Sequence, residues 1–395
     1  MAPDVQNFDV WCGLAERLAS DIDLSATARQ FGAFERARGV RSAEDLLRLA
    51  LIYGTTSLSL RATAAWASAH GLSELSDVAL LYRLQGSDSW LEALVSGLLS
   101  QALQLSGSSW VIDRRMRLID GTMISSPGAG QTSWRLHADY DLGARRFVGF
   151  ELSDRHGSES LERFEPSPGD VFLADRYYAK VAQLAHVVAH GADFLVRRGL
   201  TSCRLQHQDG RALDIGGLLK SLDPEHTLDL PVLAPLPECA GRAPLKARLI
   251  IRHIGRERAE QAHRRVRRKA AKSGHKASAK RLKAAEYVML MTSLPAEQVS
   301  ADQVLQIYRL RWQIELAFKR LKSLMGFKDL RAKDPRLVRA CLYAKLIMAL
   351  ITEDITSEIL DSFPSAPTIT SAVNLATPEH HLQTALRPDP RQLRP

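Results

Sequence analysis

Hydrophobic and polar residues follow two different periods along the chain, and each period predicts a different kind of element. Residues 31–54 place apolar side chains at helical spacing. Ser42 stands where an N-cap is expected, and Glu44 and Asp45 would occupy the first turn, where acids are favourable. The first hundred residues are therefore expected to be helical.

Residues 60–84 have helical spacing on both sides of Gly71, which predicts a helix, a turn and a second helix. The pattern resembles a helix-turn-helix, but Glu74 and Asp77 at the start of the second helix suit capping better than phosphate contact. We expect a helical N-terminal DNA-binding domain over residues 1–105, with a plain helical bundle as the alternative.

The pattern changes to strands from about residue 109. Residues 134–156 predict two strands around a turn at Leu142–Gly143, and an apolar strand ends at Asp175. A helix over residues 178–190 and a strand, DFLVRR, follow it. A strand–helix–strand unit after hairpin strands predicts a mixed α/β sheet.

The C-terminal half predicts further elements of both kinds. Residues 200–255 read as short strands interrupted by Pro and Gly, and EYVMLMTSL reads as one more strand. Helical spacing predicts one helix over about 301–325 and another over 336–355. The Pro-rich residues 361–395 are expected to be disordered.

Composition narrows the class of protein without identifying it. The chain has 395 residues, 45% hydrophobic and 25% charged, and its four cysteines have no paired spacing. This usage indicates a reducing compartment and argues against a structural zinc site. The N-terminus lacks the basic and apolar regions of a signal peptide, and no apolar run is long enough to span a membrane. We expect a cytoplasmic protein, without a membrane partner.

The positive charge is concentrated in one segment. Residues 256–283 contain twelve Lys or Arg and two acids, a net +10, whereas the whole chain carries +9. A solvated helix normally carries comparable numbers of both signs, so this segment favours contact with a polyanion. The candidate DNA-binding residues in it are Arg264, Arg265, Arg267, Arg268 and Lys269.

Three acids stand where chemistry could use them. Asp120 and Asp175 each end an apolar strand, and Gly121 allows close backbone approach beside the first. Acids at the carboxyl ends of strands face the crevice where α/β sheets bind ligands. Glu315 lies in the helix predicted over 301–325. Each acid alone could equally be a cap or a turn former.

The helix around Glu315 has an unusual polar face. At about 100° per residue, four polar side chains fall within roughly 60° of arc, beside an apolar stripe. An amphipathic helix with one ion pair between Arg311 and Glu315 remains the alternative. The four residues are Tyr308, Arg311, Glu315 and Lys322.

A site of three carboxylates suits phosphoryl transfer. Carboxylate oxygens hold Mg²⁺, and two ions about 4 Å apart activate a nucleophile and stabilise the leaving oxygen. Neighbouring Arg, Lys and Tyr side chains would hold the phosphodiester.

The spacing Y-x2-R-x3-E-x6-K from Tyr308 to Lys322 resembles the signature of the insertion-sequence-four family of bacterial DDE transposases. LIDGT around Asp120 and LADRYY around Asp175 are similar to the family's first two acidic motifs, in the same order. The resemblance covers residues 110–330 and implies a DNA-cutting, strand-joining enzyme that moves an insertion sequence by cut and paste.

The resemblance also implies the fold: a ribonuclease-H-like α/β domain whose mixed sheet has flanking helices, a β-rich insertion and a helical N-terminal domain. The catalytic domain would comprise residues 106–200 and 286–330, and the insertion residues 201–285. A C-terminal helical region would follow over 331–360.

The resemblance assigns a role to each site residue. It implies that Asp120, Asp175 and Glu315 bind two Mg²⁺ ions, with Mn²⁺ as a plausible substitute. It implies that Tyr308, Arg311 and Lys322 grip terminal phosphates while a DNA hairpin forms. Its partners would be double-stranded DNA with terminal inverted repeats, then target DNA, bound by a homodimer.

Two further positions carry over from the family, Arg197 and Tyr287, and the chain departs from the family pattern at Tyr287 and at Tyr177. Arg197 matches an arginine near the active site. Tyr287 stands where relatives can place a tryptophan that stacks on a flipped base, although it could equally pack in the core. Tyr177 replaces a glycine common after Asp-Arg, and it could crowd the metal site or point away.

Two other functions remain open at the level of sequence. A nuclease on the same fold would cut DNA without joining it, and a catalytically dead regulator would only bind it. Charge and spacing do not separate cutting from joining, whereas the signature around Glu315 favours transposition.

Overall fold

A computed structural model describes residues 22–104, 114–125, 134–154, 156–236, 243–325, 330, 332 and 334–362. The chain separates into two units, Met1–Glu353 and Asp354–Pro395. Of the second unit, the described residues belong to the end of the last helix. Residues 363–395 of the expected disordered tail lie outside the described residues.

The N-terminal region is helical, as predicted. Ser42 caps its helix by accepting a hydrogen bond from the Asp45 N–H at 3.1 Å. Ser59 and Ser76 cap two more helices in the same way, so short polar side chains set where these helices begin. The helices are α2 (Leu24–Gln30), α3 (Ala43–Thr55), α4 (Leu60–Ala69), α5 (Asp77–Gln85) and α6 (Asp88–Gln104).

The α4–α5 pair is the helix, turn and helix predicted around Gly71. Val78 and Tyr82, one turn apart on α5, are 55% and 68% exposed. Arg61 of α4 lies 3.9 Å from Asp77 of α5. The exposed side of α5 is therefore apolar and aromatic rather than basic. Within the described part of the chain, the one arginine of α5 that could contact a phosphate is Arg83, and its guanidinium donates hydrogen bonds to backbone carbonyls.

The sheet begins with five strands in the arrangement of a ribonuclease-H-like domain. Their order is β3-β2-β1-β4-β5, and β1 pairs antiparallel with β2 but parallel with β4. The hairpin of β2 and β3 turns where the sequence predicts, after Asp141. This topology confirms the predicted fold class. The strands are β1 (Arg115–Ile124), β2 (Trp134–Asp141), β3 (Arg146–Asp154), β4 (Asp170–Ala174) and β5 (Asp193–Arg197).

Three later strands extend the same sheet beyond β5. They are β6 (Leu228–Ala234), β7 (Leu245–His253) and β8 (Tyr287–Thr292), in the order β5-β8-β7-β6. All their pairings are antiparallel. The strands predicted for the insertion thus share one eight-stranded sheet with β1 to β5.

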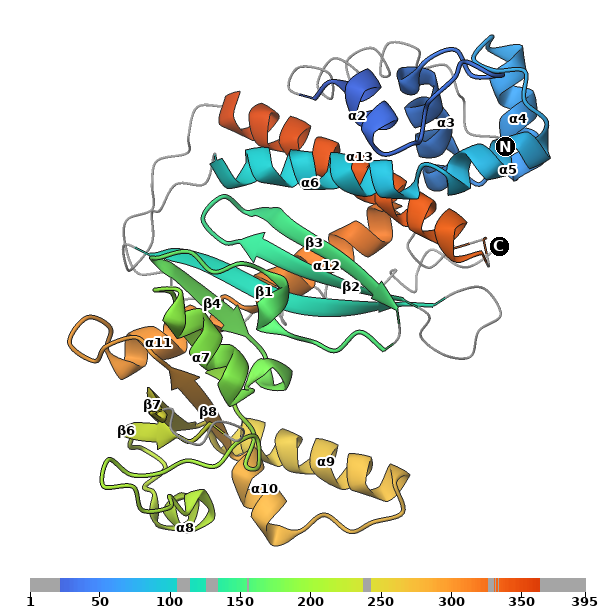
Figure 1. Cartoon of the computed structure of the whole chain (residues 1–395). Coiled ribbons are helices and arrows are strands. Elements are labelled where there is room, and N and C mark those ends of the chain that lie inside the picture. The colour runs from blue at the N-terminus through green and yellow to red at the C-terminus, as the bar shows by residue number, and fades with distance from the viewer. Residues whose placement is uncertain are drawn as a thin grey trace. The chain divides into compact units, whose positions relative to one another are not determined.

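Both faces of the sheet are covered. Val171 and Leu173 of β4 belong to one apolar core, and Phe172 and Ala174 belong to another, because successive strand side chains point to opposite faces. The first core includes α6 and the C-terminal helices, and α6 lies beside α13 (Pro335–Ser362), as Figure 1 shows. The second includes α7 (Val181–Ala189) and α8 (Ile215–Ser221).

The helix predicted over 301–325 is two helices, so that prediction is wrong in one respect. α11 (Ala301–Arg309) and α12 (Trp312–Met325) meet at Leu310 and Arg311. Four N–H groups around the junction, including those of Leu310 and Arg311, bond the carbonyl three residues earlier. This tighter winding is typical of a 3₁₀ turn, and it alters the angles that an ideal α-helix would give the polar side chains.

The basic segment forms a helical pair. α9 (Arg256–Lys272) is followed by α10 (Ala279–Ala285), and both lie at the β6–β8 end of the sheet in Figure 1. None of the helices in the described part of the chain combines the length and the apolar character that a membrane crossing requires.

Candidate active site

Strand pairing brings the first two acids together. β1 and β4 run parallel, with Ile119 opposite Ala174. Asp120 follows Ile119 within β1, which continues to Ile124, so the prediction that Asp120 ends its strand is wrong, whereas Asp175 follows Ala174 at the end of β4. Each acid comes directly after one of these partners, so the two lie side by side where the pairing of β1 with β4 ends. Asp175 also caps a short 3₁₀ turn, where its Oδ1 accepts a hydrogen bond from the Tyr177 N–H at 2.7 Å.

Asp120 lies in an environment that disfavours its negative charge. Burial raises the pKa of Asp120 to about 6, and the charges of Asp175 and Glu159 act in the same direction. The Gly121 N–H, which donates to Asp120 Oδ1 at 2.8 Å, and Arg311 act in the opposite direction. A carboxyl group held this way gains most from a nearby cation.

Arg311 connects the third acid to the first. Its Nη2 donates to Glu315 Oε1 at 2.6 Å, and its Nη1 lies 3.8 Å from Asp120 Oδ2. Glu315 is on α12, which packs against β1, and its side chain is 51% exposed. The structure therefore brings the three predicted acids to one region, with a guanidinium between two of them.

Tyr308 and Arg197 lie in the same region as the three acids. Burial raises the pKa of the Tyr308 hydroxyl to about 12, although the charges of Arg311 and Arg197 lower it. The Arg311 guanidinium lies 6.0 Å from the centre of the Tyr308 ring. Arg197 ends β5 and is exposed. The fourth member of the predicted row, Lys322, is on α12, but its side chain lies outside the described residues.

Tyr287 does not face this region. Its ring is 2% exposed in the second core, edge-on to His253 at 5.2 Å. No base can stack on it in this conformation, because burial on all sides leaves no free ring face. Its predicted stacking role therefore stays a prediction that requires the ring to become exposed. Two aromatic residues close in sequence to the site residues are exposed: Trp312, which follows Arg311 and is 47% exposed, and Tyr177, which is 58% exposed.

The predicted basic residues of α9 are all exposed. The helix packs by Ala259, which is buried, and by His263, whose Nε2 lies 3.0 Å from the Leu282 carbonyl oxygen of α10. The opposite side of α9 carries the basic side chains into solvent. The exposed predicted residues are Arg264, Arg265, Arg267, Arg268 and Lys269.

Sequence reasoning missed one acid beside this site. Glu159 lies in a loop with neither helical nor strand spacing, so nothing in the single sequence marks it. Burial raises the pKa of Glu159, and the charge of Asp175 acts in the same direction against Arg135 and Lys180. It is close enough to Asp120 to help raise the pKa of that residue.

The acids suit a hard divalent cation by their chemistry, because carboxylate oxygens are its preferred ligands. Within the described ranges, no three His, Cys, Asp or Glu side chains are grouped closely enough to hold one ion. The carboxylate of Glu315 instead accepts a hydrogen bond from the Arg311 guanidinium.

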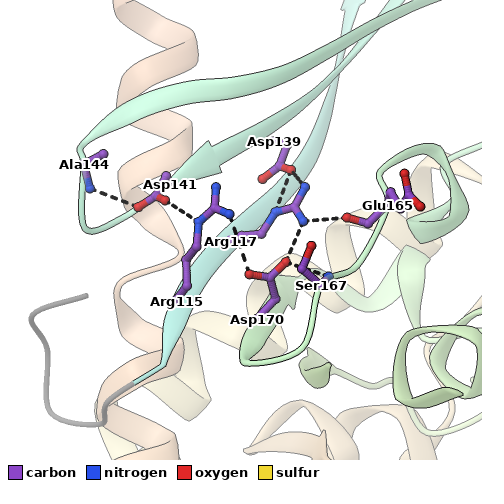
Figure 2. A network of polar contacts seen from close by, with 8 residues as sticks. All are labelled: Arg115, Arg117, Asp139, Asp141, Ala144, Glu165, Ser167 and Asp170. Atoms are coloured by element: carbon purple, nitrogen blue, oxygen red, sulfur yellow. Dashed lines mark hydrogen bonds and ion pairs between the residues drawn. The ribbon is translucent and has the colours of Figure 1, made fainter. Parts of the chain in front are cut away.

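A buried polar network fixes the starts of the two strands that carry Asp120 and Asp175 (Figure 2). Arg117 of β1 forms ion pairs with Asp139 of β2 and with Asp170 of β4, the latter at 2.7 Å. Arg115 donates to Asp141 at 2.7 Å. Because these charges are buried, removing one partner would leave another uncompensated. The network thus holds β1, β2 and β4 in register.

Comparisons with known proteins give one consistent family. A family model described as a transposase DDE domain matches residues 112–351. The chain is 39% identical over 359 residues to Escherichia coli K12 InsL, named as a putative transposase for insertion sequence element IS186A. It is also 39% identical over 360 residues to the Escherichia coli transposase for insertion sequence element IS421. Each alignment covers 90% of this chain and 96% of the relative.

More distant proteins match in part. The transposase for IS231F from Bacillus thuringiensis subsp. israelensis is 25% identical over 268 residues, covering 59% of this chain and 55% of that protein. A solved piggyBac transposase synaptic complex with hairpin DNA covers 91% of this chain and 82% of its own at a TM-score of 0.38 and 9% identity. That structural likeness is too low to support a conclusion.

Proposed function

The chain belongs to the DDE transposase family, and from this premise we propose that Asp120, Asp175 and Glu315 are its three catalytic acids. As a member, it is an enzyme that cleaves and joins DNA in the transposition of an insertion sequence, and it depends on a divalent metal ion. The family match favours this function over the nuclease and the regulator.

One observation carries the assignment of the acids. The parallel register of β1 and β4 sets Asp120 beside Asp175, and Arg311 joins Glu315 to Asp120. Residues 120, 175 and 315 are far apart in the chain, yet three separate elements bring them to one edge of the sheet. Chance placement of isolated strand-end acids does not account for that convergence.

We propose Mg²⁺, two ions per site, as the cofactor, with Mn²⁺ able to replace it. Asp120 and Asp175 would hold it together with Glu315. The metal would supply Lewis-acid activation of the attacking oxygen and stabilisation of the leaving oxygen. The protein's own task is to keep Asp120 ionised at working pH, against the burial that raises its pKa.

Arg311 supports a link between DNA binding and metal binding. Its guanidinium contacts the carboxylates of Asp120 and Glu315. A DNA phosphate that took over the guanidinium would release both carboxylates toward the cation. DNA and metal would then each strengthen the binding of the other.

Tyr308, Arg197 and Lys322 would complete the grip on the terminal phosphates. The phenol of Tyr308 would donate one hydrogen bond to a phosphate, and Arg197 would add a second guanidinium from β5. Trp312, exposed next to Arg311, supports a place where an unpaired base could stack. We propose that these residues serve nicking, hairpin formation and resolution, and strand transfer.

The DNA partner would be the terminal inverted repeats of the element, followed by target DNA. The basic face of α9 and the N-terminal helices over residues 1–105 would bind the duplex, in the cytoplasm of a bacterium and at its nucleoid. Residues 106–200 and 286–330 would form the catalytic domain, with 201–285 as the insertion. A homodimer would hold two ends, since one joining reaction uses both.

A joining assay tests the function. The full chain is incubated with Mg²⁺, a labelled duplex carrying the element's end, and a target plasmid. We expect labelled DNA covalently joined to the plasmid. Cleavage without joining would instead identify a nuclease, and retarded but intact DNA would identify a binding protein.

A further inference from the structure

Gly121, beside Asp120, leaves a small space that two polar side chains face. A Cβ at this position would lie 3.4 Å from Glu159 Oε1 and 3.6 Å from His137 Nδ1. Both distances are ordinary van der Waals contacts, so a methyl group at Gly121 would touch both side chains. The two polar atoms come from β2 and from the loop before the 3₁₀ turn Leu161–Arg163.

His137 contributes a buried atom that lacks a protein partner. The residue is fully buried, and its Nε2 lies 2.9 Å from Ser153 Oγ. Its Nδ1 has no hydrogen-bond partner among the described residues. Burial lowers the pKa of His137 to about 3, and Arg163 and Arg135 act in the same direction, so the ring is neutral at neutral pH. A buried nitrogen of this kind normally bonds water when protein offers nothing.

Glu159 contributes a carboxylate held in place by its backbone. Lys180 Nζ donates to the Glu159 carbonyl oxygen at 2.8 Å, which fixes the loop while leaving the carboxylate toward Gly121. In the described part of the chain, the carboxylate forms no ion pair within 4.0 Å. It therefore adds a third negative charge close to Asp120 and Asp175.

Three carboxylates in one half-buried place repel one another unless a cation compensates them. We propose that Glu159 is a fourth acidic residue of the active site, a positioning residue that acts with His137 through water beside Gly121. A magnesium ion keeps several of its waters, and these need acceptors. Glu159 and His137 would accept from such waters and raise the affinity for the cation held by Asp120 and Asp175. The inference rests on that proposed role of the two aspartates.

The test is Mn²⁺ binding to the full chain without DNA, followed by electron paramagnetic resonance of the free ion. Outer-shell partners of metal sites typically contribute 10- to 100-fold in affinity. We expect Glu159→Gln to weaken Mn²⁺ binding by about that factor. Glu162→Gln is the matched control, because Glu162 is exposed three residues further on, and it should bind as the native chain does. Thermal melting checks that each variant folds.

Gly121→Ala tests the proposed water position in a second way, because it adds a methyl group beside Glu159 and His137. Its methyl group meets Glu159 and His137 at ordinary contact distances, so we expect a folded protein with weakened Mn²⁺ binding. If Glu159→Gln and Gly121→Ala bind Mn²⁺ like the native chain while Asp120→Asn does not, the inference is wrong and the proposed function stands. Native binding by Asp120→Asn as well would overturn the proposed metal site itself.

Discussion

The chemistry at Asp120 depends on a balance between burial and neighbouring charge. Burial together with Asp175 and Glu159 raises its pKa to about 6, whereas the Gly121 N–H and Arg311 oppose that rise. The carboxyl group is therefore ionised at neutral pH at a cost in stability. Sites that bind charged ligands are often destabilised in this way until the ligand arrives.

Asp120→Asn should stabilise the metal-free protein at pH 8. Because folding raises the pKa of Asp120, its penalty to stability is absent below the ordinary value of 3.8, grows as pH rises, and is complete above the folded value of about 6. Unfolding by urea in EDTA should show a gain of at most about 3 kcal/mol at pH 8, shrinking as pH falls from 6 toward 4. A gain in stability at pH 4 equal to that at pH 8 would contradict the pKa assigned to Asp120.

The titration of Asp120 should also make the affinity for metal depend on pH. Because the cation requires the carboxylate, Mn²⁺ affinity should rise as pH passes upward through about 6. Titrations of Mn²⁺ at several pH values measure this, and an affinity independent of pH between 5 and 7 would exclude the titration of Asp120 as its cause.

At the scale of elements, the junction between α11 and α12 is the feature that helical periodicity misses. An ideal helix would carry Tyr308, Arg311 and Glu315 on one face, but the 3₁₀ winding at Leu310 intervenes. Arg311 still reaches Glu315 at 2.6 Å across the start of α12. The spacing thus predicts residues that the structure brings together, while their angles come from the local 3₁₀ winding at the junction.

The basic face of α9 gives an element-scale prediction for DNA binding. Replacing Arg264, Arg267 and Arg268 by Gln should weaken binding of the element's end. The logarithmic slope of its salt dependence should flatten by about 0.9 for each phosphate that the variant no longer neutralises. Binding is measured by fluorescence anisotropy at several salt concentrations.

A control variant for α9 removes three exposed charges elsewhere: Arg204→Gln, Lys220→Gln and Lys246→Gln. It changes the net charge by the same amount, so it separates a general effect of charge from a specific effect of the helix. Equal weakening in both variants would show that α9 has no special role.

At the scale of the whole molecule, the sequence predicts the strands near the active site well. β1, β4 and β5 form where the apolar runs lie, and Asp175 follows the end of β4 as predicted, whereas β1 continues past Asp120 to Ile124. The local pattern of apolar residues predicts these strands because strands that are buried on both faces appear in the sequence as continuous apolar runs. The pairing of β5 with β8 is not predictable in this way, since it joins residues about a hundred positions apart through register alone.

Two residues show why the remaining site could not be predicted. Tyr287 matches a family position, but its burial comes from packing against His253 and the second core, which no single-sequence pattern reports. Glu159 has no motif, and only the fold brings it to Gly121. Residues whose surroundings are set by tertiary packing are not marked by hydrophobic periodicity in the sequence.

The central claim is that three acids from β1, β4 and α12 act as one site, and Glu315→Gln tests it most directly. The rate of cleavage of a labelled element end is measured in Mg²⁺, with DNA binding followed in parallel. Glu297→Gln, an exposed acid outside the site, is the control. We predict that Glu315→Gln abolishes cleavage and joining while it still binds the end, and that Glu297→Gln is fully active. Cleavage by Glu315→Gln at the native rate would contradict the site.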